Sequence, residues 1–191
     1  RLHELVVQLP GVGFPFDFRE GVGRFRNHRG AAEALEIGIE ARTLLDWLYH
    51  LTDGALRGRA EDDAFVLLGR APSGARFTVR ARLVPDASNA RSEGDEPLLT
   101  LSLYDVRVYG YTPEPWPLLA AQIIDHLPTE LVADRTLTTA RLRGVRLMLA
   151  QGLADLAWKL PDLSALQASG VELRGGVLTA RFAAPRAADA D

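Results

Sequence analysis

Four histidines and two runs of carboxylates are the side chains best suited to metal or acid–base chemistry, and they are scattered along the chain. The histidines are His3, His28, His50 and His126. No two of them stand four residues apart, the spacing at which a helix presents a pair of metal ligands. We therefore expect no metal site. We interpret His50 and His126, which fall near predicted helix C-termini, as capping or surface residues.

Other catalytic patterns are missing as well. The carboxylate runs 61–63 and 95–96 are typical of solvated loops, not of an acid–base pair. No serine stands in a Gly-x-Ser-x-Gly pattern, and the glycine pairs at 11/13 and 21/23 lack the strand–helix setting of a dinucleotide site. The chain has no cysteine, which excludes disulfides and thiol catalysis. We expect neither an enzyme nor a cofactor.

Asp105 is the charged residue that interrupts an apolar strand, and it has two interpretations. If it is buried, its carboxylate has a raised pKa or orients a ligand headgroup. If it is exposed, it faces solvent beside Arg107, as most carboxylates do.

A strand that leads into a short amphipathic helix occurs three times, and each helix carries one tryptophan. The tryptophans either pack in the core, line a ligand groove or mark a membrane-facing rim. The three units are 33–41 into 44–51 with Trp47, 99–109 into 116–127 with Trp116, and 141–149 into 153–160 with Trp158.

Details of the alternation predict local structure. Thr43 is a plausible N-cap of the first helix. The apolar phase of strand 99–109 changes after Leu103, which predicts a β-bulge or a strand covered on both faces. Residues 145–149 fit either period two or a helical period, and we favour a strand that breaks at Gly152.

Other segments frame these units. Strand 76–84 should bury Phe77, Val79, Ala81 and Leu83 and expose its arginines. Residues 2–9 predict an entry strand, 11–18 a loop with core-facing aromatics, and 86–97 a long hairpin connection. Residues 171–182 predict a terminal hairpin that turns at Gly175-Gly176, followed by a flexible tail at 183–191.

The composition predicts one domain, residues 1–191, with 47% apolar and 25% charged residues. The net charge of −3 argues against nucleic acid as a partner and gives no pull toward anionic lipid. No apolar run is long enough to cross a membrane. Because the sequence opens on Arg1 instead of methionine, a signal peptide or anchor upstream is compatible with it, and so is the cytoplasm.

The order of these elements resembles the tubular lipid-binding (TULIP) superfamily, especially its bacterial envelope relatives. The resemblance runs through 32–51 (AEALEIGIEARTLLDWLYHL), 77–109, 145–161 and 170–182 (GVELRGGVLTARF). It implies an α+β fold in which a strongly bent antiparallel sheet wraps around helices and holds a lipid. In this chain the helices are short and amphipathic.

We therefore expect a non-enzymatic protein that binds or transports a lipid or other apolar ligand, in the periplasm or on an envelope membrane. The alternative is a scaffold that binds a partner protein in an apolar groove. An acyl chain needs no polar motif, because each buried methylene contributes roughly 0.8 kcal/mol. The predicted groove is formed by Trp47, Leu48, Leu101, Leu103, Val106, Trp116, Leu119, Ile123, Leu149 and Trp158.

Overall fold

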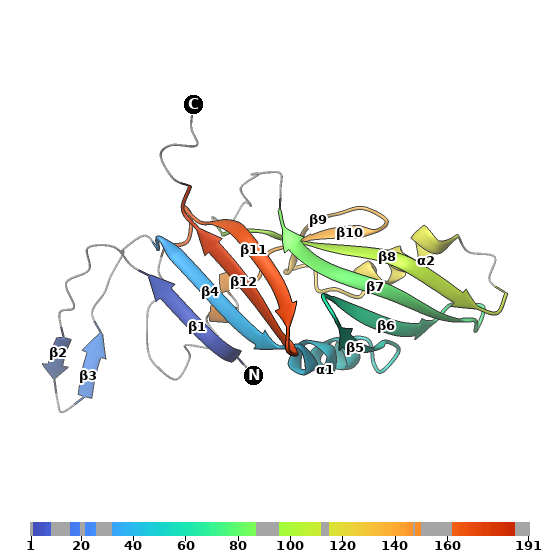
Figure 1. Cartoon of the computed structure of the whole chain (residues 1–191), viewed down its shortest axis with the longest axis horizontal. Coiled ribbons are helices and arrows are strands. Elements are labelled where there is room, and N and C mark those ends of the chain that lie inside the picture. Colours follow the sequence, from blue (N-terminus) through green and yellow to red (C-terminus); the bar gives the residue numbers. More distant parts are fainter. Residues whose placement is uncertain are drawn as a thin grey trace.

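The predicted α+β class with antiparallel sheets is confirmed. The computed structural model describes residues 2–8, 16–19, 22–25, 32–86, 96–111, 115–146, 148–149 and 162–185. Within these residues the strands form a four-stranded sheet, a six-stranded sheet and a two-stranded pair, all antiparallel, with two helices (Figure 1). The pair consists of β2 (Phe16–Arg19) and β3 (Val22–Phe25), in a stretch predicted as a loop up to residue 18.

The four-stranded sheet joins the two ends of the sequence. Its order is β1 (Leu2–Gln8), β4 (Ala34–Glu40), β12 (Val177–Ala183) and β11 (Gln167–Arg174). The β11–β12 hairpin turns at Gly175-Gly176, as predicted, and both glycines have positive φ. β12 continues through Ala183, where the tail was expected to begin, and residues 186–191 lie outside the described residues.

The six-stranded sheet comes from the middle of the chain. Its order is β5 (Arg57–Glu61), β6 (Ala64–Arg70), β7 (Arg76–Pro85), β8 (Leu99–Tyr109), β10 (Thr139–Leu142) and β9 (Val132–Arg135). β7 and β8 are antiparallel neighbours, which confirms that the segment between them is a hairpin connection. Residues 87–95 of that connection lie outside the described residues.

Helix α1 (Ala41–Leu51) starts without a break from β4, so the predicted N-cap at Thr43 is wrong. Thr43 lies inside the helix, and Glu40 occupies the N-cap position, where its carboxylate makes no capping hydrogen bond to the N–H groups of the first turn. The Ala41 N–H instead donates to the Gly176 carbonyl at 2.8 Å. One of the four N–H groups that a helix start leaves unpaired is thus satisfied by the β11–β12 turn.

The bulge predicted in strand 99–109 is confirmed and centres on Asp105. Thr78 pairs with Arg107 and Arg80 pairs with Tyr104, so one residue of β7 faces two residues of β8. Asp105 takes a φ of +48°. This left-handed residue inserts one position into β8, which reverses the side-chain phase after Leu103.

The strand predicted over 141–149 is wrong beyond Leu142. β10 ends there, and residues 145, 146, 148 and 149 are helical, with the Met148 N–H donating to the Gly144 carbonyl at 2.9 Å. Glu96 accepts hydrogen bonds from the backbone N–H groups of Gly144 and Arg146. This carboxylate, from the β7–β8 connection, caps the helical segment. The cap explains why these residues form a helix instead of a strand.

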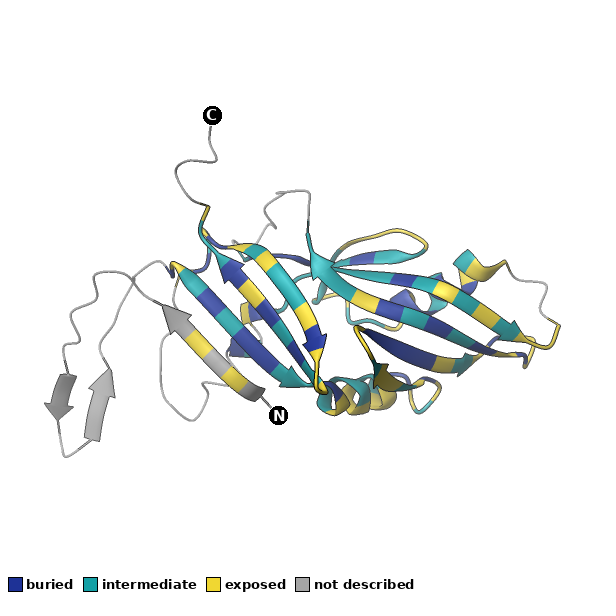
Figure 2. Ribbon diagram, in the orientation of Figure 1, coloured by how far each residue is buried: buried dark blue, intermediate teal, exposed yellow. Residues whose placement is uncertain are grey.

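Among the described residues, two apolar clusters form the core. Figure 2 shows how buried and exposed positions alternate along the strands that bound it. The first lies on one face of the six-stranded sheet, under α1 and α2 (Trp116–Asp125). The second lies against the four-stranded sheet and includes Val145, Leu149 and Phe182. Leu83 and Val171 contact both clusters, so the two sheets share a continuous interior.

The alternation predicted for 76–84 is confirmed at Phe77, Val79 and Ala81, which are buried. Leu83 is half-buried. The expectation that Arg80 lies in water is wrong: the residue is half-buried, and its Nε is buried with no hydrogen-bond partner among the described residues. Its cross-strand neighbours Val66 and Tyr104 lie on either side of it, which accounts for the burial.

Candidate functional site

Most of the residues predicted to form a groove are brought together by the fold. Six of the ten belong to the first cluster, and they come from α1, β8 and α2. Leu149 belongs to the second cluster. The six are Leu48, Leu101, Leu103, Val106, Leu119 and Ile123.

The tryptophans are placed differently from the rest of the predicted set. Trp47 is 43% exposed and Trp116 is 49% exposed, so neither packs in the core. Each tryptophan lies outside the apolar stripe of its helix. The residues that face the core are Leu44 and Leu48 in α1, and Leu119 and Ile123 in α2. Trp158, with the third predicted helix, lies outside the described residues.

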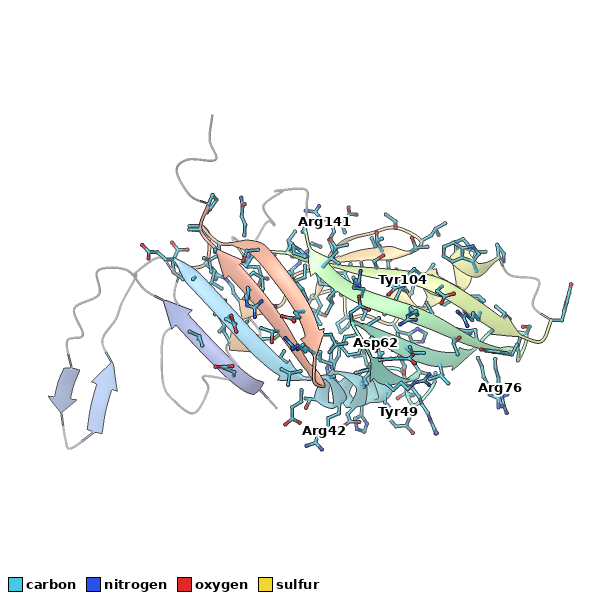
Figure 3. All side chains as sticks on the ribbon, viewed as in Figure 1. Arg42, Tyr49, Asp62, Arg76, Tyr104 and Arg141 are labelled. Atoms are coloured by element: carbon cyan, nitrogen blue, oxygen red, sulfur yellow. The ribbon has the colours of Figure 1, made fainter. Side chains whose placement is uncertain are left out.

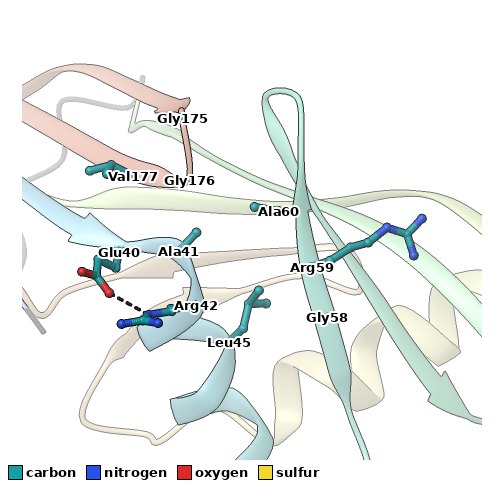
Figure 4. Close-up of a pocket in the computed structure, with 10 residues that line it drawn as sticks. All are labelled: Glu40, Ala41, Arg42, Leu45, Gly58, Arg59, Ala60, Gly175, Gly176 and Val177. Carbon is teal, nitrogen blue, oxygen red and sulfur yellow. Dashed lines mark hydrogen bonds and ion pairs between the residues drawn. The ribbon is translucent and has the colours of Figure 1, made fainter.

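An open pocket of about 570 Å³ lies where α1 begins (Figure 4). It is bounded by the end of β4, the first turn of α1, the strand β5 and the β11–β12 turn. The lining is mostly small or apolar. Its residues are Glu40, Ala41, Arg42, Leu45, Gly58, Arg59, Ala60, Gly175, Gly176 and Val177.

Two glycine positions shape this pocket. At Gly58, an added Cβ would lie 2.6 Å from Leu45 Cδ2 and 2.9 Å from Leu67 Cδ2, so glycine permits α1 to lie close over β5. At Gly176, an added Cβ would meet nothing within 4 Å, because the turn borders the open pocket. The close approach of α1 to β5 forms the floor of the pocket, and the β11–β12 turn lies at its opening.

β5 is the edge strand of the six-stranded sheet, and its free edge faces the pocket. The two-residue turn at Asp62–Asp63 makes Glu61 and Ala64 a hydrogen-bonded pair. Because hydrogen-bonded pairs alternate along an antiparallel ladder, Arg59 with Val66 and Arg57 with Leu68 are hydrogen-bonded pairs too. The N–H and C=O groups of Gly58 and Ala60 therefore point away from β6. Among the described residues no hydrogen bond to these outward groups is found.

The charged residues of the pocket are paired at its rim. Arg42 Nε donates to Glu40 Oε2 at 2.8 Å, and Arg59 Nη2 lies 3.5 Å from Glu61 Oε2. These exposed pairs leave the apolar floor without a charge. The site therefore offers apolar area inside and polar groups at its edge, which is the usual composition of a small-molecule pocket.

The candidates for acid–base or metal chemistry do not converge. Asp105 is exposed and accepts hydrogen bonds from the Arg107 guanidinium at 3.0 and 3.2 Å, which raises the pKa of Arg107. His126 Nδ1 lies 2.6 Å from the Gln122 carbonyl within its own helix. In the described part of the chain no three His, Asp or Glu side chains are grouped to hold a metal ion.

The sequence alone did not identify the pocket residues. None of the predicted groove residues lines the pocket. The pocket does lie at a junction between a strand and a helix, and the groove was expected at such a junction. The detectable signals were the Gly175-Gly176 turn and Gly58 within a charged strand. Nothing in the sequence indicated that these two segments meet beside Ala41.

Comparisons of the chain with protein-family models, curated proteins and solved structures found no match. No helix in the described ranges is long and apolar enough to span a bilayer.

Proposed function

We propose that this protein binds a lipid or another apolar ligand without transforming it, and that it does so as a TULIP-like carrier of the bacterial envelope, in the periplasm or at a membrane. The observation that carries the proposal is the open pocket beside Ala41, with its apolar floor and polar rim. Its volume, about 570 Å³, falls within the range of small-molecule sites, which is about 300–1,000 Å³.

The pocket borders the first core cluster, which supports an apolar occupant. Ala41 and Leu45 line the pocket and also pack against that cluster. The surrounding side chains Leu44, Leu45 and Leu48 are only half-buried, so α1 leaves apolar area uncovered on this side. An acyl chain entering here would gain roughly 0.8 kcal/mol for each methylene it buries.

The test is a titration with a fluorescent fatty acid. Ala60→Trp places a large side chain at the pocket from an exposed position, so we expect the variant to fold and to lose saturable binding. Ala165→Trp is the matched control, because Ala165 is exposed and precedes β11 at the opposite end of the hairpin from Gly175. Equal binding by the two variants, or none by the unaltered protein, would contradict the proposal.

A scaffold that binds a partner protein is the second candidate, and the free edge of β5 favours it. The alternating N–H and C=O groups of Gly58 and Ala60 are complementary to an extended peptide, which can add to the sheet as a further strand. Ala60→Pro separates the two candidates. It removes an outward N–H at an edge position where proline is tolerated, so peptide binding should be lost while fatty-acid binding remains.

A further inference from the structure

The outer face of the six-stranded sheet is rich in arginine. Strand register places on this face the residues that alternate with the buried Phe77, Val79 and Ala81 of β7, together with their cross-strand partners. On β5 to β8 the arginines of this face are Arg57, Arg59, Arg70, Arg76, Arg80, Arg82 and Arg107. The sheet thus concentrates positive charge on one face of a chain whose net charge is −3.

Carboxylates neutralise only one part of this face. Glu61 pairs with Arg59, Asp63 with Arg82 and Asp105 with Arg107. The Arg57 guanidinium lies 5.6 Å from the centre of the Tyr49 ring, which is a cation–π contact.

Arg70 and Arg76, at the end of the sheet, have no carboxylate partner in the described part of the chain. They face each other across β6 and β7. The next pair is hydrogen-bonded, since Ala71 N–H donates to the Ala75 carbonyl at 2.8 Å. Arg70 and Arg76 therefore form a non-hydrogen-bonded pair, in which side chains lie closest. Like charges directly opposite each other destabilise a sheet, so folding does not account for this pair.

Exposed aromatic residues lie on β8 beside Arg76 and on the element that follows β8 in the chain. Tyr109 is the β8 neighbour of Arg76, and Tyr111, two residues further, is 84% exposed. Trp116 and Leu118, on the first turn of α2, are exposed as well. Arg76 projects from this end of the sheet (Figure 3). Arginine beside tyrosine, with a tryptophan and a leucine exposed on the next helix, is a combination that suits the interface between lipid headgroups and acyl chains.

We propose that this end of the six-stranded sheet docks on an anionic bilayer surface. Arg70 and Arg76 contact the lipid phosphates or carboxylates, and Tyr109, Tyr111 and Trp116 lie at headgroup level. The negative charge on the rest of the molecule orients this end toward the membrane. Exposed apolar Trp116 and Leu118 favour a bilayer over a nucleic acid, whose binding depends on many phosphate contacts. This docking surface does not depend on the pocket beside Ala41.

The test is flotation of the purified protein with vesicles of phosphatidylcholine, alone or mixed with phosphatidylglycerol. We expect binding to the mixed vesicles only, and weakening by salt. Arg70→Gln/Arg76→Gln should reduce the partition coefficient about thirtyfold, at about fivefold for each charge. The control, Arg146→Gln/Arg174→Gln, removes the same charge from exposed positions elsewhere and should leave binding unchanged.

A second measurement tests whether Trp116 contacts the bilayer. Tryptophan emission should shift to the blue on mixed vesicles, and Trp116→Phe should abolish most of that shift. Both double variants alter exposed residues, and their melting curves establish that they are folded. The proposal is overturned if the protein ignores mixed vesicles, if both double variants bind equally, or if the protein binds duplex or single-stranded DNA in preference to vesicles.

Discussion

Leu45 of α1 lies directly over Gly58 of β5, so close that a methyl group on Gly58 would stand 2.6 Å from Leu45 Cδ2. The same methyl group would be 3.2 Å from the Val66 carbonyl oxygen. This contact seats α1 on the edge strand and forms the floor of the pocket. Glycine is required here for space, since no positive φ is found at this position.

Gly58→Ala should therefore destabilise the protein by about 1–3 kcal/mol, the usual effect of adding atoms to a packed contact. Urea unfolding measures the change. Gly170→Ala is the control, because its added Cβ meets nothing within 4 Å, and we expect a change of no more than about 0.5 kcal/mol. Similar losses in both variants would show that α1 does not pack on β5 as described.

Phe77→Ala should lower the free energy of unfolding by about 3–5 kcal/mol, because Phe77 is 4% exposed in the first cluster. Arg82→Ala is the comparison on the same strand. Arg82 is exposed and its ion pair with Asp63 is a surface pair, so its loss should be within about 1 kcal/mol. Equal melting temperatures for the two variants would mean that the register of β7 is wrong.

Arg80→Met should leave stability unchanged or raise it by about 1 kcal/mol. The substitution keeps the aliphatic part of the side chain and removes a buried Nε for which the described part of the chain offers no hydrogen-bond partner. Arg82→Met, at an exposed position, provides the baseline. A loss of more than 1 kcal/mol at Arg80, about twice the usual surface effect, would show that its guanidinium makes a stabilising contact.

Asp105→Gly should preserve or raise stability, whereas Asp105→Val should lower it by about 1–2 kcal/mol. A φ of +48° suits glycine, is tolerated by Asp, and is strained for a β-branched residue. The ion pair with Arg107 is exposed and contributes little. Thermal unfolding of the two variants tests this, and a more stable Val variant would argue against the bulge.

Arg70→Glu should stabilise the protein by about 0.2–1 kcal/mol, because it converts a repulsive cross-strand pair with Arg76 into an attractive one. The same variant should lose binding to anionic vesicles. A gain in melting temperature together with a loss of flotation would show that this pair is retained for binding instead of folding. A fall in stability would contradict the cross-strand register.

An element could be predicted from the sequence where the interaction that decides its structure lies within the element itself. The bounds of strand 99–109 followed from its apolar alternation, and the change of phase within it predicted a bulge or a strand covered on both faces, of which the structure shows the bulge. Residues 145–149 satisfied both periods, and the choice was made by Glu96, about 50 residues earlier, which caps the helical turn. Local pattern carries no information about such a partner.

The same reasoning explains what was missed at the candidate site. The pocket joins residues near 40, 58 and 176, whose meeting depends on the pairing of β4 with β12. The two described tryptophans were predicted to line the groove, with packing in the core and a membrane-facing rim as the alternatives. Each stands beside the apolar stripe of its short helix, and short helices bury only one stripe.

The placement of β12 between β4 and β11 has a consequence for synthesis. Residues 57–142 contain every strand of the six-stranded sheet, so that sheet can form while the chain is still being made. β4 leaves the ribosome before the strands of the six-stranded sheet, whereas its neighbour β12 leaves after all of them. Until β12 arrives, one edge of β4 stays open to pairing with other chains. A chain truncated before Val177 would keep that edge permanently, and we expect it to aggregate or to be degraded.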